Sequence, residues 1–135
     1  MIARERLHVM VGLVADQAGR WLIAQRRAGQ HMAEAWEFPG GKKTRSEGRL
    51  AGLKRELTEE LGIEVLAAEP VLEIEHDYPD RRVLLDVWVV RAYSGEPESR
   101  EGQPLRWVAV HDLSGAGLLD ADRPIIEALE RLRSL

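Results

Sequence analysis

The stretch GKKTRSEGRLAGLKRELTEELGI, from Gly41 to Ile63, places four glutamates in one short segment, three of them within five residues. On a helix that turns by about 100° per residue, Glu56, Glu59 and Glu60 share one face. Like charges at these spacings destabilise an isolated helix by about 0.2–0.5 kcal/mol per pair. The cluster therefore indicates either a bound cation or an exposed helix whose glutamates are neutralised by neighbouring basic residues.

The same segment predicts a helix over roughly residues 47–61 that ends at Gly62. Gly52 lies on the glutamate side of this helix, where glycine costs about 1 kcal/mol relative to alanine. An apolar stripe on another face is expected to anchor the helix to the core and contains Leu50, Leu53, Leu57 and Leu61. The repelling glutamates and the glycine are two unfavourable features on one face, which favours a functional site.

Strand patterns lie on both sides of this helix. The expected strands are 7–14, 21–25, 65–78, 83–93 and 106–110. Residues 28–41 are expected to be irregular because Gly29, Pro39 and two further glycines interrupt them. Pro124 opens a final helix, and its apolar face contains Ile125, Ile126, Leu129 and Leu132. This order predicts an α/β fold with a mixed sheet packed between helices.

Length and composition narrow the class of protein. The 135 residues suit one domain spanning 1–135, and 44% hydrophobic with 31% charged residues is typical of a globular protein. A net charge of −4 argues against stable nucleic-acid binding, and the lack of cysteine excludes disulfides and cysteine-based zinc sites. The apolar runs are too short to cross a membrane, so we expect a cytoplasmic protein with no membrane partner. The sequence is compatible with a monomer and with a homodimer.

A longer pattern contains the helix. Gly41 is followed after five residues by Glu47, and after seven more by residues 55–63, which read RELTEELGI. This resembles the Nudix box, G-x5-E-x7-R-E-U-x-E-E-x-G-U with U a bulky aliphatic residue, at all nine specified positions. The resemblance implies an α/β/α sandwich with a mixed sheet between helices. It also implies a Mg²⁺-dependent hydrolase of nucleoside diphosphates linked to another group.

Short segments outside the box resemble the MutT-type branch of the same family. They are RRA at 26–28, HMA at 31–33, EFPGG at 37–41, YPDR at 78–81 and EGQP at 101–104. This resemblance implies hydrolysis of 8-oxo-dGTP to the monophosphate and pyrophosphate, with Mg²⁺ or substituting Mn²⁺, which removes oxidised guanine from the nucleotide pool. The alternatives are the same chemistry on CTP, modified dCTP or several dNTPs, and a noncatalytic nucleotide sensor. The complete set of box glutamates argues against the sensor.

The resemblance also implies roles for individual residues. The expected metal ligands are Glu56, Glu59, Glu60, the Gly40 carbonyl and, directly or through water, Glu101. Such hard oxygen donors suit Mg²⁺, Mn²⁺ or Ca²⁺. Arg55 is expected to orient a catalytic glutamate through a charge-assisted hydrogen bond. Either Glu56 or Glu101 is expected to act as the general base, and the sequence does not choose between them.

A second group of residues is expected to contact the substrate. It comprises Arg27, His31, Glu37, Phe38, Pro39, Gly40, Arg81 and Asp122. Arg26 and Arg27 end a strand on opposite faces, and the MutT-type pattern favours Arg27 for phosphate. Asp122 stands where MutT-type enzymes carry an asparagine that recognises the base. An ionised aspartate only accepts hydrogen bonds, so it suits the N–H groups of oxidised guanine or the amine of cytosine or adenine, and meets O6 only when protonated. Asp122 could instead favour the N-terminus of the last helix.

Overall fold

The computed structural model describes residues 6–30, 32–79 and 81–133. Its strands form a four-stranded mixed sheet in the order β4-β1-β6-β5 and a three-stranded antiparallel sheet in the order β3-β2-β7. The strands are β1 (Arg6–Leu13), β2 (Trp21–Gln25), β3 (Trp36–Glu37), β4 (Gly40–Lys42), β5 (Glu64–Tyr78), β6 (Arg81–Ser94) and β7 (Leu105–Val108). The expected mixed sheet is confirmed, with the difference that a separate small sheet accompanies it.

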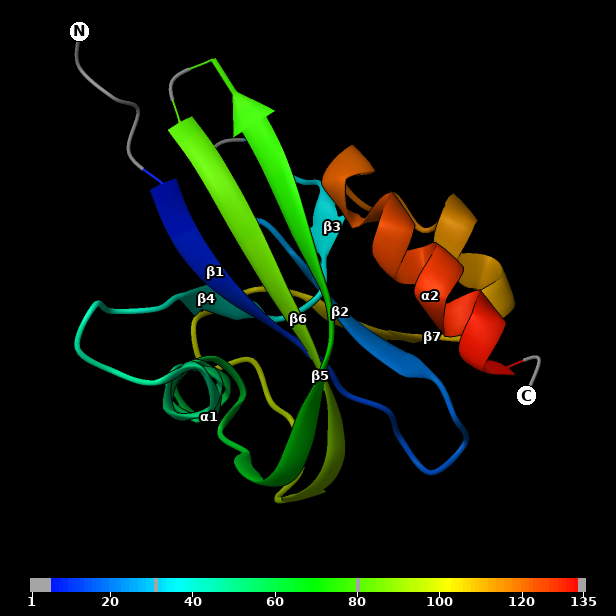
Figure 1. Ribbon diagram of the computed structural model, residues 1–135. Coiled ribbons are helices and arrows are strands. Elements are labelled where there is room, and N and C mark those ends of the chain that lie inside the picture. The colour runs from blue at the N-terminus through cyan, green and yellow to red at the C-terminus, as the bar shows by residue number, and fades with distance from the viewer. Residues whose placement is uncertain (1–5, 31, 80, 134–135) are drawn as a thin grey trace, which may run out of the picture.

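Two α-helices lie on opposite sides of the strands (Figure 1). They are α1 (Arg49–Leu61) and α2 (Arg123–Arg133), and α2 follows the short 3-10 helices η1 (Val110–Gly115) and η2 (Asp120–Asp122). The expected arrangement of a sheet between helices is therefore confirmed. Neither helix combines the length and the apolar character that a membrane-spanning helix needs.

Alternation along the central strands divides the core into two clusters. Val11 of β1 pairs with Val87 of β6, and both pack in the cluster that α2 covers. Met10 and Trp88, one position away on each strand, face the leucines of α1. Each fully buried leucine of α1 stabilises the fold by about 2 kcal/mol. Apolar side chains therefore pack on both faces of the sheet, and this packing fixes the position of α1.

The apolar faces of both helices are shorter than expected. Leu53, Leu57 and Leu61 are fully buried, but Leu50 is 38% exposed. Leu132, near the end of α2, is 43% exposed. The expectation that Leu50 anchors α1 to the core was wrong, and the apolar face of α2 extends to Leu132, beyond its buried part. A helical wheel gives the direction of a side chain, whereas burial also depends on how far along the helix the opposing surface extends.

The expectation that residues 28–41 are irregular was wrong in part. Trp36 and Glu37 form β3 and pair with the end of β2, and β4 begins at Gly40 and pairs with β1. Glycine has little intrinsic preference for a strand, but a neighbouring strand can impose the conformation through backbone hydrogen bonds. The pairing of β4 with β1 places Gly40 and Gly41 against the polar face of α1.

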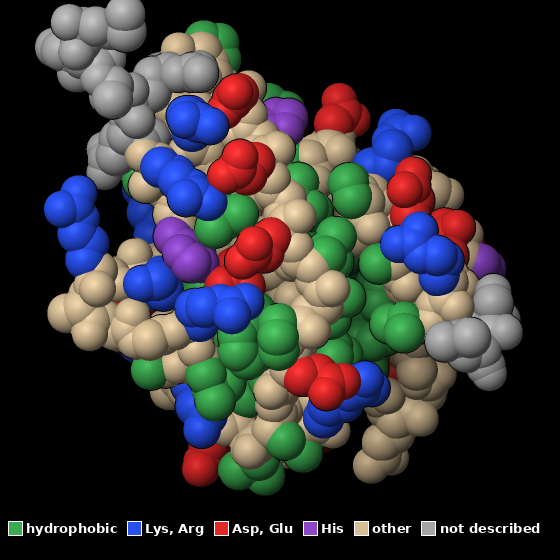
Figure 2. Space-filling view, in the orientation of Figure 1, with side chains coloured by type: hydrophobic (Ala, Val, Ile, Leu, Met, Phe, Trp, Pro, Cys, Tyr) green, Lys and Arg blue, Asp and Glu red, His purple; other side chains and the backbone are tan. Residues whose placement is uncertain are grey.

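Several element boundaries also differ from expectation by one or two residues. The helix starts at Arg49 and not at 47, and the strand expected over 106–110 ends at Val108. The second difference follows from pairing, because Val108 is opposite Trp21, the first residue of β2. Figure 2 shows acidic and basic side chains interspersed over the visible face, without a large patch of one sign.

Candidate active site

Arg55 organises the polar face of α1. Its guanidinium donates to Glu56 at 2.9 Å and to Glu59 at 3.1 Å. It also donates to both carboxylate oxygens of Glu47, at 2.7 and 3.0 Å, and to the Lys42 carbonyl at 2.9 Å. One arginine therefore contacts two of the expected ligands and links them to the preceding loop.

Glu47 and Gly52 explain how this loop lies against the helix. Glu47 accepts from the Thr44 amide at 2.9 Å, and its hydrogen bonds with Arg55 lower its pKa to about 2. A Cβ on Gly52 would lie 3.1 Å from both Glu47 and Lys43. The glycine that looked unfavourable in an isolated helix therefore allows the loop to pack closely on α1.

Glu56 packs directly on the backbone of β4. A Cβ on Gly41 would lie 2.1 Å from Glu56 Oε2, so only glycine leaves room for the carboxylate. Burial raises the pKa of Glu56, and Arg55 partly offsets this effect. The Glu56 carboxylate is thus held in a cradle formed by Gly41 on one side and Arg55 on the other.

We expect Gly41→Ala to lower turnover by about 10²-fold, since a displacement of roughly 1 Å in an active site has effects of this size. The melting temperature should change little, because the new methyl group meets the end of a flexible side chain. Gly48→Ala is the matched control, as nothing lies within 4 Å of a Cβ at that position. Equal turnover in both variants, measured as pyrophosphate release, would show that the position of Glu56 is unimportant.

Glu60 carries the most perturbed carboxyl of this face. Its Oε2 accepts from the Gly40 amide at 3.1 Å. Although the residue keeps some exposed surface, desolvation of the carboxyl raises its pKa to about 8, and the negative charges of Glu37, Glu101 and Glu56 act in the same direction. Such a group gains stability from a nearby cation.

Glu101 lies in the loop between β6 and β7, close enough for its charge to raise the pKa of both Glu56 and Glu60. Its backbone carbonyl accepts from Arg27 Nη1 at 2.8 Å. Arg27, expected at the substrate phosphates, is therefore attached to the Glu101 loop. The structure brings the sequence-distant Glu101 to the acidic face of α1.

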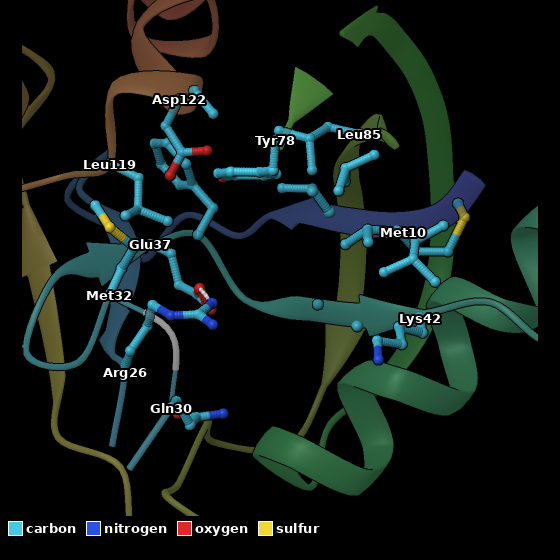
Figure 3. Close-up of a pocket in the computed structure, with 18 of the residues that line it drawn as sticks. Met10, Arg26, Gln30, Met32, Glu37, Lys42, Tyr78, Leu85, Leu119 and Asp122 are labelled. Carbon is cyan, nitrogen blue, oxygen red and sulfur yellow. Dashed lines mark hydrogen bonds and ion pairs between the residues drawn. The ribbon is translucent and has the colours of Figure 1, made fainter. Parts of the chain in front are cut away.

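The structure contains a pocket of about 300 Å³ beside β4. Gly40 and Gly41 line it next to the acidic face, and Arg26, Glu37, Phe38 and Arg81 are also among its lining residues. Figure 3 shows Asp122 and Tyr78 at one end of the pocket and Lys42, beside α1, at another. Pro39 is buried next to it, with its carbonyl bonded to the Gly12 amide, and His31 lies outside the described residues.

Arg26 and Arg27 lie differently with respect to the pocket. Arg26 lines the pocket and donates to both oxygens of Glu37, at 2.7 and 3.1 Å, whereas Arg27 is exposed. Alternation showed that only one of the two arginines faces inward, but it did not show which one. Met32, Tyr78 and Leu119 also line the pocket and were given no role, because scattered apolar residues carry no signal of a ligand site.

Asp122 is 5% exposed and lines the pocket just before α2. Among the described residues, its Oδ2 is a buried side-chain atom without a hydrogen-bond partner. Burial raises the pKa of Asp122 to about 7, helped by the charge of Glu37 and opposed by Arg26. A buried polar atom without a partner is costly, so it points to a group that binds there.

The donor set suits a hard divalent cation, although the described side chains do not already converge on one point. No three carboxylate or imidazole groups of residues 6–30, 32–79 and 81–133 form a metal-binding cluster, and Arg55 instead contacts Glu56 and Glu59. The cradle at Gly41 and the desolvated Glu60 carboxyl both fit a site that gains from positive charge. Carboxylates with a backbone carbonyl nearby are ligands that Mg²⁺ and Mn²⁺ accept.

Comparison with known proteins identifies the family. The model of the NUDIX domain matches residues 10–128, which is most of the chain. The chain belongs to the Nudix family. Nudix hydrolases generally use a divalent metal ion and act on nucleotide substrates. The matched residues include the whole of α1 and therefore its acidic face.

Three similar proteins place the chain within the Nudix family. The 8-oxo-dGTP diphosphatase of Escherichia coli K12 is 35% identical over 128 residues, which cover 95% of this chain and 99% of that protein. The CTP pyrophosphohydrolase of the same organism is also 35% identical, over 93% of each chain. A solved MutT structure, from work on Aliivibrio salmonicida and Vibrio cholerae, has a TM-score of 0.80 and 30% identity and covers 93% of this chain and 97% of that one. Because this chain is equally identical to the 8-oxo-dGTP diphosphatase and to the CTP pyrophosphohydrolase, sequence identity does not favour an oxidised guanine substrate over a cytosine substrate.

Proposed function

We propose that this protein is a Mg²⁺-dependent nucleoside triphosphate diphosphatase that hydrolyses 8-oxo-dGTP to 8-oxo-dGMP and pyrophosphate. The observation that carries the proposal is the pocket, which extends from the unpartnered buried oxygen of Asp122 to the backbone of Gly40 and Gly41 beside the glutamates of α1. The similar 8-oxo-dGTP diphosphatases support the choice of substrate. One end of the pocket receives the base, and the other receives the phosphates.

The acidic face supplies the hydrolytic half of the site. Glu56, Glu59, Glu60, the Gly40 carbonyl and Glu101 hold the cation, for which Mn²⁺ can substitute. When bound, it neutralises phosphate charge and lowers the pKa of a water. Arg55 keeps Glu56 and Glu59 in place through its hydrogen bonds. The general base is Glu56 or Glu101.

The protonation state of Asp122 decides which base edge it recognises. With a pKa of about 7, Asp122 is present at neutral pH both as a carboxylate and as a neutral acid. The neutral acid donates one hydrogen bond and accepts another, so it can donate to O6 of 8-oxoguanine while accepting from an adjacent N–H. The carboxylate only accepts, and suits the exocyclic amine of cytosine. This second property, with the similarity to the CTP pyrophosphohydrolase, makes cytosine nucleotides the second candidate.

We further propose that residues 1–135 act as one domain, in the cytoplasm, on a free nucleotide and without stable nucleic-acid binding. The net charge of −4 supports a small-molecule substrate over a polyanionic one. The functional unit is a monomer or a homodimer, and size-exclusion chromatography with light scattering separates the two.

Pyrophosphate release with Mg²⁺ tests the substrate directly. The panel contains 8-oxo-dGTP, dGTP, CTP and 5-methyl-dCTP, and we expect kcat/KM to be highest for 8-oxo-dGTP. Equal kcat/KM for dGTP and 8-oxo-dGTP would remove the sanitising role, and a maximum for CTP or 5-methyl-dCTP would support the second candidate. Binding of a nucleotide without turnover of any would favour a noncatalytic sensor.

Asp122→Asn isolates the contribution of this side chain to base preference. In the wild type, we expect the ratio of kcat/KM for 8-oxo-dGTP over CTP to fall between pH 6 and pH 8. The reason is that deprotonation through a pKa of about 7 removes the donor that O6 needs. An amide does not titrate there, so the ratio for Asp122→Asn should be independent of pH. Equal pH profiles for both proteins would show that Asp122 does not read the base and serves the start of α2 instead.

A further inference from the structure

The structure describes three strongly buried polar residues, Asp86, Gln103 and Asp122. Asp86 accepts hydrogen bonds at 2.7 and 2.9 Å from Arg49, the first residue of α1. Asp122 faces the pocket. Gln103 is 6% exposed and lies two residues after Glu101, in the loop that reaches the other end of α1. It takes no part in the interactions described so far.

The amide of Gln103 joins two separate pieces of backbone. Its Oε1 accepts from the Glu101 amide at 3.1 Å and from the Ser99 hydroxyl at 2.9 Å. Its Nε2 donates to the Glu60 carbonyl at 3.2 Å. A backbone N–H can only donate and a carbonyl can only accept, so the partners themselves determine which end of the amide is oxygen.

These bonds attach the Glu101 loop to the C-terminal end of α1. The last carbonyls of a helix have no partner within the helix and need one elsewhere. Two loop amides meet this need: Arg100 donates to Glu60 at 3.1 Å, and Glu98 donates to Leu61 at 3.0 Å. Gln103 adds the side-chain link at Glu60, so the loop is joined to the same turn that carries the Glu60 carboxylate.

The backbone of Glu101 is consequently held from both sides. Gln103 receives its N–H, and Arg27 donates to its carbonyl. The Glu101 side chain itself is exposed, yet its charge acts on Glu56 and Glu60. The position of this carboxylate relative to α1 therefore depends on the backbone links more than on packing of its own side chain.

We propose that Gln103 is a positioning residue that holds the Glu101 carboxylate beside the acidic face of α1, where it serves as a ligand of the divalent cation. The inference rests on the proposed function, because it requires a cation at that face. A partner that orients a ligand contributes strongly to affinity, since a misplaced ligand must be moved before it can bind.

Gln103→Met tests the proposal, since methionine has similar length and makes no comparable hydrogen bonds. We expect the Kd for Mn²⁺, measured by electron paramagnetic resonance without nucleotide, to rise by about tenfold. The Mg²⁺ concentration for half-maximal turnover should rise similarly. In a Glu101→Gln background, the same substitution should change neither quantity further, because its effect acts through Glu101.

Two other variants separate this role from a general loss of stability. Tyr93→Phe removes a half-buried hydrogen bond of the same kind, from the Tyr93 hydroxyl to the Ala15 carbonyl at 2.9 Å, away from the site. It should lower the melting temperature without changing the Kd for Mn²⁺. Ser99→Ala removes one bond to Gln103 at an exposed position, so it keeps the fold and should weaken Mn²⁺ binding in the same direction by a smaller factor.

The outcomes distinguish this inference from the proposed function. An unchanged Kd for Mn²⁺ in Gln103→Met, or an equal effect of Gln103→Met with and without Glu101→Gln, overturns the positioning role. A Glu101→Gln variant that binds Mn²⁺ like the wild type also overturns it, because Glu101 is then no ligand. If the wild type neither binds Mn²⁺ nor releases pyrophosphate, the proposed function itself fails.

Discussion

Glu59→Gln should lower kcat for 8-oxo-dGTP by about 10³-fold, because loss of a metal ligand removes several kcal/mol of charge stabilisation in the transition state. The free energy of unfolding should change by no more than about 0.5 kcal/mol, since the side chain is 55% exposed and its described partner is Arg55. Pyrophosphate release and thermal unfolding of the same preparations measure the two quantities.

Glu69→Gln is a closely matched control for this experiment. Glu69 also has a 55% exposed side chain, and it pairs with Arg91 on the β5–β6 ladder. Both substitutions remove one charge and weaken one exposed ion pair, but only Glu59 lies on the acidic face of α1. If the two variants keep the same kcat, Glu59 is an ordinary surface residue and the proposed metal site is wrong.

Glu60→Gln should abolish turnover while making the metal-free protein more stable. In the folded protein the pKa of Glu60 is raised from 4.5 to about 8, so the folded state binds the proton more tightly than the unfolded state does. The stabilisation of the fold by the protonated Glu60 carboxyl is complete below about pH 4.5 and is lost as the pH rises through about 8. Glutamine carries no charge and avoids that loss.

The difference in free energy of unfolding between Glu60→Gln and the wild type should therefore grow with pH. Without metal, we expect it to be near zero at pH 4.5 and to reach on the order of 1–4 kcal/mol at pH 8.5, below the full value of the pKa shift because Glu60 is partly exposed. Added Mg²⁺ should stabilise the wild type and have little effect on the variant. Chemical denaturation across this pH range, with and without Mg²⁺, provides the measurement.

A wild-type protein that is as stable as Glu60→Gln at pH 8.5 without metal would contradict the account of Glu60. It would mean that the carboxyl is well hydrated or is neutralised by a protein cation. Glu69→Gln again serves as the control, because an exposed glutamate should give a difference that varies little between pH 5 and pH 8.5.

Some features of this protein follow from local sequence alone. The 3.6-residue apolar spacing of α1 and the continuous apolar runs of β1 and β6 are local features of the sequence, so the bounds of these elements were predicted to within two residues. Gly62 ends α1 in the left-handed conformation that its position predicted. Glu56, Glu59 and Glu60 share one helix face for the same local reason. Arg55 is next to Glu56 in the sequence, so their proximity is also a local feature.

Other features depend on contacts between distant segments, which periodicity does not describe. β3 and β4 exist because β2 and β1 offer backbone partners, and Leu50 is exposed because the opposing surface ends before it. The inward direction of Arg26, the burial of Asp122 and the link from Gln103 to Glu60 arise in the same way. Burial and hydrogen bonding between remote residues set these positions and the pKa of each carboxyl, so they required the folded chain.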